Sequence, residues 1–288
     1  MTVEFVKNVG FRLFNKGKSM IMETASVGRP GATLTDKEIL QYGIAVSIYL
    51  DGASGRGELS YRSTRITPAQ APHSLADDVA FKFTDDDGLR YWVNGNIKLS
   101  PPSTYLTIEN QHAMDKREGM AHVHLRGPER FMTMSATSGF NSAIICTSSD
   151  ARKSERSLRH QKFGSRLLKI NGVSEFAAKV AEMSGAERYA VRDVVYSDVK
   201  VVTGDSDFPE KFASINGVGD LRDNTMEIIA HEHLDELIVA SEAAALFTKP
   251  IQYWLERERR LQFVFGADVM GPIFCKDATL AKHVEVVT

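Results

Sequence analysis

The chain has 288 residues, of which 43% are hydrophobic and 25% are charged, and its formal net charge is −2 at pH 7. This composition is ordinary for a globular protein, and the length is enough to bury a core in one large domain or two. The near-zero charge excludes a general basic field for nucleic acid, although a local basic patch is compatible with it. No apolar run approaches the length of a membrane span.

Two cysteines, Cys146 and Cys275, are too few for a disulfide framework or a zinc site. The first residues, MTVEFVKNVG, lack the apolar region of a signal peptide. We therefore expect a cytoplasmic protein with reduced thiols and no membrane partner.

Strand signals dominate the N-terminal quarter of the chain. Thr35 and Glu38 form a capping box that predicts a short helix start in this region. Pro68 and Pro72 follow in a polar stretch typical of a linker. We therefore predict a β-rich N-terminal region over residues 1–72 and an α+β domain over residues 73–288. The strands expected before the linker are Phe5–Phe14, Ser19–Val27, Gly43–Leu50 and Leu59–Ile66.

From residue 77 onward the pattern mixes helix and strand. Residues 85–93 are predicted to form a short helix, because Asn94-Gly95 behind them is a helix-ending signal. Phe176, Val180 and Met183 recur at helical spacing, and a longer helix is expected over residues 225–247. Strands are expected at residues 79–83, 97–100, 122–125, 130–134, 143–146, 166–170 and 194–202.

Glu256 and Glu258 precede an apolar strand near the C-terminus. Residues two apart in a strand face the same side, so an extended segment would present both carboxylates together. The same alternation predicts that Arg257 and Arg259 point away from the acids and that Arg260 shares their face, where it pairs with them or with a phosphate. A solvated strand entry or a charge-paired helix end is the structural alternative.

Two more patterns have both a structural and a functional interpretation. The apolar strand at 144–146 ends in the hydroxyls of Thr147 and Ser148, which are typical turn formers but also suit a ribose. Lys82 lies between Phe81 and Phe83, so it points to solvent or lines a cleft and holds a phosphate.

Metal and thiol chemistry have weaker signals. In a strand, His122 and His124 share a face and could ligate a metal with a third partner. His231 and His233 diverge if their segment is helical, and the His-Glu-x-x-His spacing is absent. Cys146 ends an apolar strand, which predicts a buried thiol and not a nucleophile.

The order of these segments resembles a large group of bacterial proteins that are often encoded near phage-defence genes and are named only as a domain of unknown function. The group has an aromatic-Lys-aromatic strand, an Asn-Gly turn with a strand ending Ser-x-Pro, an Asp-x-x-Glu-Gly element, an apolar strand closing in Cys and Ser, and a late Glu-x-Glu-x-Arg block. The matching segments are Phe81–Phe83, Asn94–Pro102, Asp115–Gly119, Ile144–Ser148, and Lys249–Tyr253 with Glu256–Arg260.

The same order is similar to that of ADP-ribosyltransferases. The resemblance implies a split mixed or antiparallel sheet with flanking helices and NAD as the substrate. It implies that Lys82 holds the phosphates or ribose of NAD and that Tyr105 stacks on the nicotinamide. Thr147 and Ser148 would form the hydroxyl-bearing strand. Glu258 would be the catalytic acid, and Glu256 would orient the acceptor.

We therefore expect an enzyme that transfers ADP-ribose from NAD to RNA, DNA or protein, as a toxin or effector of a phage-defence or toxin–antitoxin system with an antitoxin or chaperone partner. A carboxylate near the ribose would stabilise the positive charge that develops when the nicotinamide bond breaks. One alternative is a non-enzymatic sensor or interaction module. Another is a metal-dependent nuclease built on His231, Glu232, His233 and Asp235.

Overall fold

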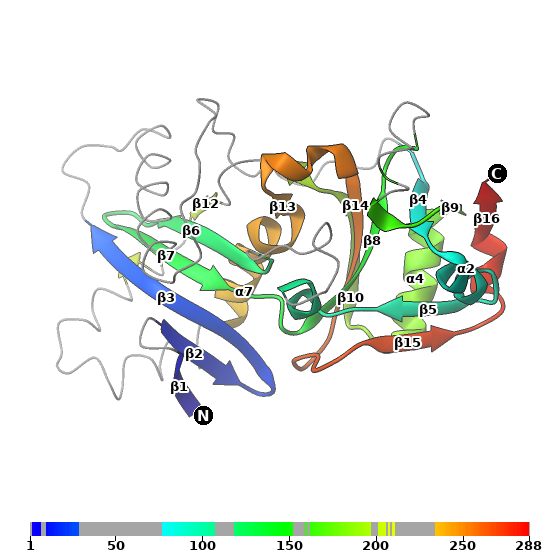
Figure 1. Ribbon diagram of the computed structural model, residues 1–288. Helices are drawn as coiled ribbons and strands as arrows, with labels where there is room; N and C mark the ends of the chain where they lie inside the picture. The colour runs from blue at the N-terminus through cyan, green and yellow to red at the C-terminus, as the bar shows by residue number, and fades with distance from the viewer. Residues whose placement is uncertain are drawn as a thin grey trace. The chain divides into compact units, whose positions relative to one another are not determined.

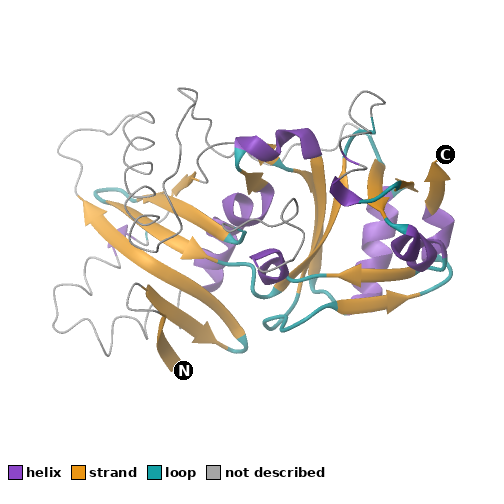
Figure 2. Ribbon diagram, viewed as in Figure 1, coloured by secondary structure: helices purple, strands orange, loops and turns teal. Residues whose placement is uncertain are grey.

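The computed structural model describes residues 2–6, 10–28, 77–106, 118–151, 159, 162–196, 201–205, 207, 209–210 and 234–287 (Figures 1 and 2). The chain divides into two compact units. Unit 1 comprises Met1–Gln70, Gly119–Gly139 and Ser197–Pro250, and unit 2 comprises Ala71–Glu118, Phe140–Tyr196 and Ile251–Thr288.

The predicted boundary near residue 72 lies beside the junction at Gln70, but residues 73–288 do not form one domain. The physical reason is strand pairing. β7 (Phe131–Thr137) pairs with β3 (Lys18–Gly28) along most of its length, so a segment from the middle of the chain completes the N-terminal sheet. The predicted strands and the capped helix start between residues 29 and 76 lie outside the described residues.

Unit 1 is built on a six-stranded sheet in the order β1-β2-β3-β7-β6-β12. Lys16 and Gly17 join β2 to β3 with positive φ angles of 49° and 83°, the combination that a tight two-residue hairpin requires. The pair β6–β12 is parallel and the others are antiparallel. The bounds of the remaining elements are β1 Thr2–Val6, β2 Gly10–Asn15, β6 Met120–Arg126, β12 Val201–Asp205, α7 Leu234–Phe247 and β13 Thr248–Lys249.

The helix α7 packs against β6 and β12. Leu237, Ile238 and Leu246 of this helix are buried. The predicted helix over residues 225–247 is confirmed from Leu234 onward, and its earlier part lies outside the described residues. Among the helices described, none is long and apolar enough to cross a membrane.

Unit 2 is built on an antiparallel sheet in the order β10-β14-β8-β4-β9-β16. With the short helices beside it, this sheet confirms the predicted α+β class. The element bounds are β4 Val79–Thr84, β8 Ser142–Ser148, β9 Arg166–Asn171, β10 Arg188–Asp193, β11 Val195–Tyr196, β14 Glu258–Val264 and β16 Val284–Val287. The helical bounds are α2 Asp86–Val93, η1 Pro102–Leu106, α4 Val173–Ser184, η2 Ile251–Glu256 and η3 Leu280–His283.

The core of unit 2 lies between this sheet and the helices. Phe176 and Val180 of α4, predicted from their helical spacing, are fully buried there. Phe176 stacks on Trp92 of α2 with ring centroids 5.9 Å apart. The sheet residues in the same core are Ala80, Ala143, Ile145, Leu168, Ile170, Leu261 and Phe263.

The helix α2 begins and ends where the sequence predicts. The Asp85 carboxylate accepts a hydrogen bond from the Gly88 backbone N–H at 2.7 Å, which satisfies one of the first amides of the helix. Asn94 is the C-cap, and Gly95 follows with a φ of +69°. The helix carries the chain from β4 to β5 (Asn96–Leu99), which pairs with β15 (Ile273–Lys276) in a second, two-stranded sheet.

The sheet of unit 2 opens along one edge of β8. β4 meets β8 at Phe81, opposite Ser148, whereas Ser100, just after β5, forms a bridge with Ile144 of β8. The two strands therefore diverge from the same edge of β8, and Cys146 lies between the two points of attachment. This opening positions the site described next.

Candidate functional site

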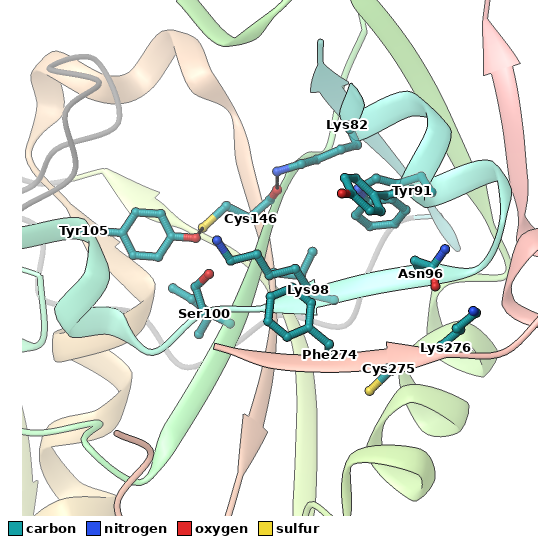
Figure 3. Close-up of a pocket in the computed structure, with 14 residues that line it drawn as sticks. Lys82, Tyr91, Asn96, Lys98, Ser100, Tyr105, Cys146, Phe274, Cys275 and Lys276 are labelled. Atoms are coloured by element: carbon teal, nitrogen blue, oxygen red, sulfur yellow. Dashed lines mark hydrogen bonds between the residues drawn. The ribbon is translucent and has the colours of Figure 1, made fainter. Parts of the chain in front are cut away.

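A cavity of about 730 Å3 lies where β4 and β5 diverge from β8 (Figure 3). Its lining residues come from β4, α2, β5, η1, β8 and β15, all of which belong to unit 2. The volume falls within the range of about 300–1,000 Å3 that is typical of small-molecule sites.

The cavity is lined by cationic side chains. Lys82 comes from β4, Lys98 from β5 and Lys276 from β15, and none of the described residues that line the cavity is an aspartate or glutamate. Figure 3 shows the amino groups of Lys82 and Lys98 directed toward the end of the cavity where Tyr105 and Ser100 lie. This end combines positive charge with hydroxyl groups, which suits an anion.

Strand alternation explains why the β5–β15 sheet presents these groups. Ile97 and Leu99 are buried in the core, so the residues between and beside them face the other way, toward the cavity. Lys98 lies directly opposite Phe274 in the antiparallel register, and the next pair on the same face is Asn96 with Lys276. Cross-strand neighbours of this kind have Cβ atoms about 4.5–5.5 Å apart.

Two aromatic rings border the cavity. Tyr91 projects from α2 with 63% of its surface exposed, and Phe274 projects from β15 with 74% exposed. Their neighbours in sequence, Trp92 and Cys275, are buried. Other apolar residues therefore fill the core, and the rings of Tyr91 and Phe274 remain exposed beside the lysines.

Lys82 fills the opening in the sheet. Its Nζ donates a hydrogen bond to the Cys146 carbonyl at 2.8 Å, in the place where a strand would otherwise pair with β8. Burial lowers the pKa of Lys82, while the nearby Glu258 carboxylate opposes that shift. Burial in a site with a lowered pKa is typical of functional lysines, although structural networks produce it too.

The Cys146 thiol donates a hydrogen bond to the Tyr105 hydroxyl, with 3.4 Å between sulfur and oxygen. Burial raises the pKa of Cys146 to about 12, and the charge of Glu258 adds to the shift. Burial also raises the pKa of Tyr105 well above its usual value. Both groups are therefore neutral at physiological pH. Cys146 is predicted to be a buried thiol, but it is only partly buried and lines the cavity.

Beside the cavity lies a buried ion cluster of Arg260, Glu258 and Glu118. The Arg260 guanidinium donates to both oxygens of Glu118 at 2.6 and 2.9 Å, and its Nε donates to Glu258 at 2.6 Å. The side chains of Arg260 and Glu118 are each 1% exposed and that of Glu258 is 5% exposed. The two carboxylates hold the pKa of Arg260 well above its usual value despite the burial.

The predicted site residues separate into two groups. Lys82 and Tyr105 line the cavity, and Glu258 and Arg260 lie close enough to shift the pKa of Cys146 or Tyr105. Thr147 and Ser148 instead donate their hydroxyl hydrogens to the carbonyls of Arg259 and Glu256, at 2.6 and 2.9 Å. These two hydroxyls have the structural role of a strand end.

The expected pairing of Glu256 with Glu258 on one strand face is wrong. Glu256 ends the helix η2, and Arg257 has a φ of +42°, which breaks the extended conformation between the two acids. From Glu258 onward the alternation holds. Arg260 shares the face of Glu258, and Arg259 points elsewhere and pairs with Asp193 at 2.6 Å.

The predicted site lacks the residues of the β5–β15 sheet and of α2 that line the cavity. The pattern Ile97-Lys98-Leu99 signals that Lys98 faces away from the core, but nothing local identifies its partner strand. Nothing in the sequence distinguishes Phe274 and Tyr91 from aromatic residues of the core. These missed residues are Tyr91, Asn96, Lys98, Phe274 and Lys276.

Family models, curated proteins and solved structures gave no significant match to the chain. The site is therefore interpreted from its own chemistry. Among the described residues, no group of three or more His, Cys, Asp and Glu side chains is placed to hold a metal ion. His231, Glu232 and His233 lie outside the described residues, and Asp235 forms an ion pair with Lys18 at 3.3 Å.

Proposed function

We propose that unit 2 binds a small phosphate-bearing ligand in the cavity between β4 and β5. The observation that carries this proposal is the lining, which includes three lysines and no described acidic side chain. Lysine ammonium groups bind phosphate as point charges. The hydroxyls of Ser100 and Tyr105 add hydrogen-bond donors at the end of the cavity toward which Lys82 and Lys98 point.

The electrostatics of Lys82 support an anionic ligand. Its pKa is lowered because burial disfavours the charged form. An anion next to Nζ would stabilise that charged form and offset part of the burial cost. The cavity would then supply binding and orientation, as in a small-molecule sensor, and a non-enzymatic sensor or interaction module is one interpretation of the sequence.

Transfer of ADP-ribose from NAD is the second candidate function. It would be accompanied by an ADP-ribosyltransferase-like fold. It is supported by the place of Lys82 and Tyr105, both of which the resemblance assigns to NAD and both of which line the cavity. Glu258 lies near them but is bound to Arg260 and is not among the described lining residues. Transfer would therefore require Glu258 to leave Arg260, whereas binding requires no rearrangement.

Calorimetric titration with inorganic pyrophosphate tests the binding function. Lys98→Gln removes an exposed cation from the cavity and is expected to weaken pyrophosphate binding about tenfold or more, the usual worth of a charged hydrogen bond. Lys282→Gln makes the same charge change at an exposed residue of unit 2 that does not line the cavity, and is expected to leave binding within about twofold. Equal effects of the two substitutions, or no binding by the wild-type protein, would refute the proposal.

The second candidate has its own test. The protein is incubated with NAD labelled in its adenylate part and with cell extract, and macromolecules are examined for label. Transfer by the wild-type protein that is lost in Glu258→Gln would support the NAD-dependent activity and identify its acceptor. Binding of NAD without transfer would be consistent with the binding function and would refute the enzymatic one. The proposed toxin role and the antitoxin or chaperone partner would be refuted with it.

A further inference from the structure

We infer that the ligand is a nucleotide whose base stacks on Tyr91 and Phe274 while its phosphates lie at the end of the cavity marked by Lys82, Lys98, Ser100 and Tyr105. This inference rests on the proposed phosphate-binding function and adds the part of the ligand that is not phosphate. It is carried by two rings that the fold of unit 2 leaves uncovered at one and the same cavity.

The cavity has two chemically different ends. Figure 3 shows the amino groups of Lys82 and Lys98 and the Tyr105 hydroxyl gathered at one end, and Tyr91, Asn96 and Lys276 at the other. Phe274 is the cross-strand neighbour of Lys98, so a ring stacked on it lies within a few ångströms of the cationic end. A nucleotide has this polarity, because a sugar joins its planar base to its phosphates.

The two aromatic rings come from independent elements. Tyr91 is on α2, the helix that follows β4. Phe274 is on β15, which lies near the C-terminal end of the chain. Single exposed aromatic residues are common and need no explanation. Tyr91 and Phe274, however, line one cavity together with three lysines. This combination of flat apolar surface and positive charge binds nucleotides through stacking and phosphate contacts.

Asn96 supplies a polar group at the ring end. It lies opposite Lys276 on the outward face of the β5–β15 sheet and lines the cavity. Its amide offers both a hydrogen-bond donor and an acceptor, which is the pattern needed to contact the edge of a base. Stacking alone tolerates every base, so Asn96 is the residue that would discriminate among them.

The same nucleotide unit could come from a free nucleotide or from a single-stranded nucleic acid. The shared chemistry is one base with its adjacent phosphate. The two sources are distinguished by titrating ADP, NAD and a short single-stranded oligonucleotide under the same salt conditions. A free-nucleotide site is expected to bind ADP at least as tightly as the oligonucleotide, and the reverse order would assign the site to a strand.

The decisive measurement compares ADP with inorganic pyrophosphate, which has the same phosphates and no ring. ADP is expected to bind about 5- to 150-fold more tightly, the range that one stacked base contributes. Tyr91→Ala and Phe274→Ala should each reduce the affinity for ADP and leave that for pyrophosphate unchanged. Tyr189→Ala is the matched control, since Tyr189 is an exposed aromatic residue of unit 2, 44% accessible, away from the cavity.

Each outcome separates the inference from the function on which it rests. If pyrophosphate binds but ADP binds no more tightly, the nucleotide inference is refuted and the phosphate function stands. If neither binds, both fail. If the aromatic substitutions weaken pyrophosphate and ADP equally, the rings only shape the cavity, and the assignment of the base is wrong. Asn96→Ala should alter the order of affinity among the four nucleoside diphosphates, and an unchanged order would remove its role in base recognition.

Discussion

Replacement of Arg260 by methionine is expected to destabilise the protein strongly. Arg260 binds Glu118 through two hydrogen bonds of 2.6 and 2.9 Å and binds Glu258 through one of 2.6 Å, and its side chain is 1% exposed. The substitution keeps the apolar volume but removes the cation from between two buried carboxylates. Removing one partner of a buried ion pair typically costs about 3–5 kcal/mol, because the remaining charge has lost its solvation.

The free energy of unfolding, measured by urea denaturation, is the direct assay. Arg166→Met provides the matched control, because Arg166 also bonds a carboxylate at 2.6 Å, that of Asp86, but both partners are exposed. An exposed pair contributes about 0–1 kcal/mol. The contrast between the two variants isolates the effect of burial from that of the ion pair itself.

A further variant sharpens the test. The triple change Arg260→Met, Glu118→Met and Glu258→Met removes all three charges and should recover most of the loss, since replacement of a buried ion cluster by apolar residues of similar volume is often close to neutral in stability. A deficit below about 1 kcal/mol, or no recovery in the triple variant, would contradict this account of the cluster.

Three more predictions follow from local geometry. Alkylation of native Cys146 at pH 8 should be at least about tenfold slower than that of a thiol with a pKa of 9.0, because a pKa raised to about 12 leaves far less thiolate, and labelling at the rate of a free thiol would contradict this. Asp85→Ala should cost about 1 kcal/mol of unfolding free energy through loss of the cap on α2, and Asp85→Asn should retain most of it. Gly95→Ala should cost about 2 kcal/mol or more, since Gly95 has a φ of +69° and an added Cβ would lie 2.0 Å from the Asp277 carbonyl oxygen; thermal melts equal to wild type would refute this.

Local signals predict much of unit 2. The helix over residues 85–93 follows from its ending signal, and the side-chain directions of Arg259 and Arg260 follow from strand alternation. The alternation fails one step earlier because Arg257 adopts a left-handed conformation, which is rare for a residue with a Cβ and has no signal in this sequence. Predictions therefore hold where a regular repeat operates and fail at the residue that interrupts it.

The cavity could be predicted only in part. Lys82 and Tyr105 are named from the sequence, but the opposite wall needs the pairing of β5 with β15, whose strands are separated by most of unit 2. Glu118 shows the same limitation. Its segment stands out in the sequence, but its partner Arg260 lies 142 residues later. Contacts between distant segments depend on the tertiary fold, for which local spacing has no signal.

The strand order of the unit 1 sheet determines when each strand can pair during synthesis of the chain. β1, β2 and β3 are synthesised first, but the free edge of β3 finds its partner only when Phe131–Thr137 has been made, roughly 100 residues later. At about 5–20 residues per second, that edge waits on the order of 5–20 s. An unpaired edge is a template for aggregation. A fragment that ends near residue 72 would keep β3 in this state permanently, so expression of the N-terminal region alone should yield aggregates and not a folded domain.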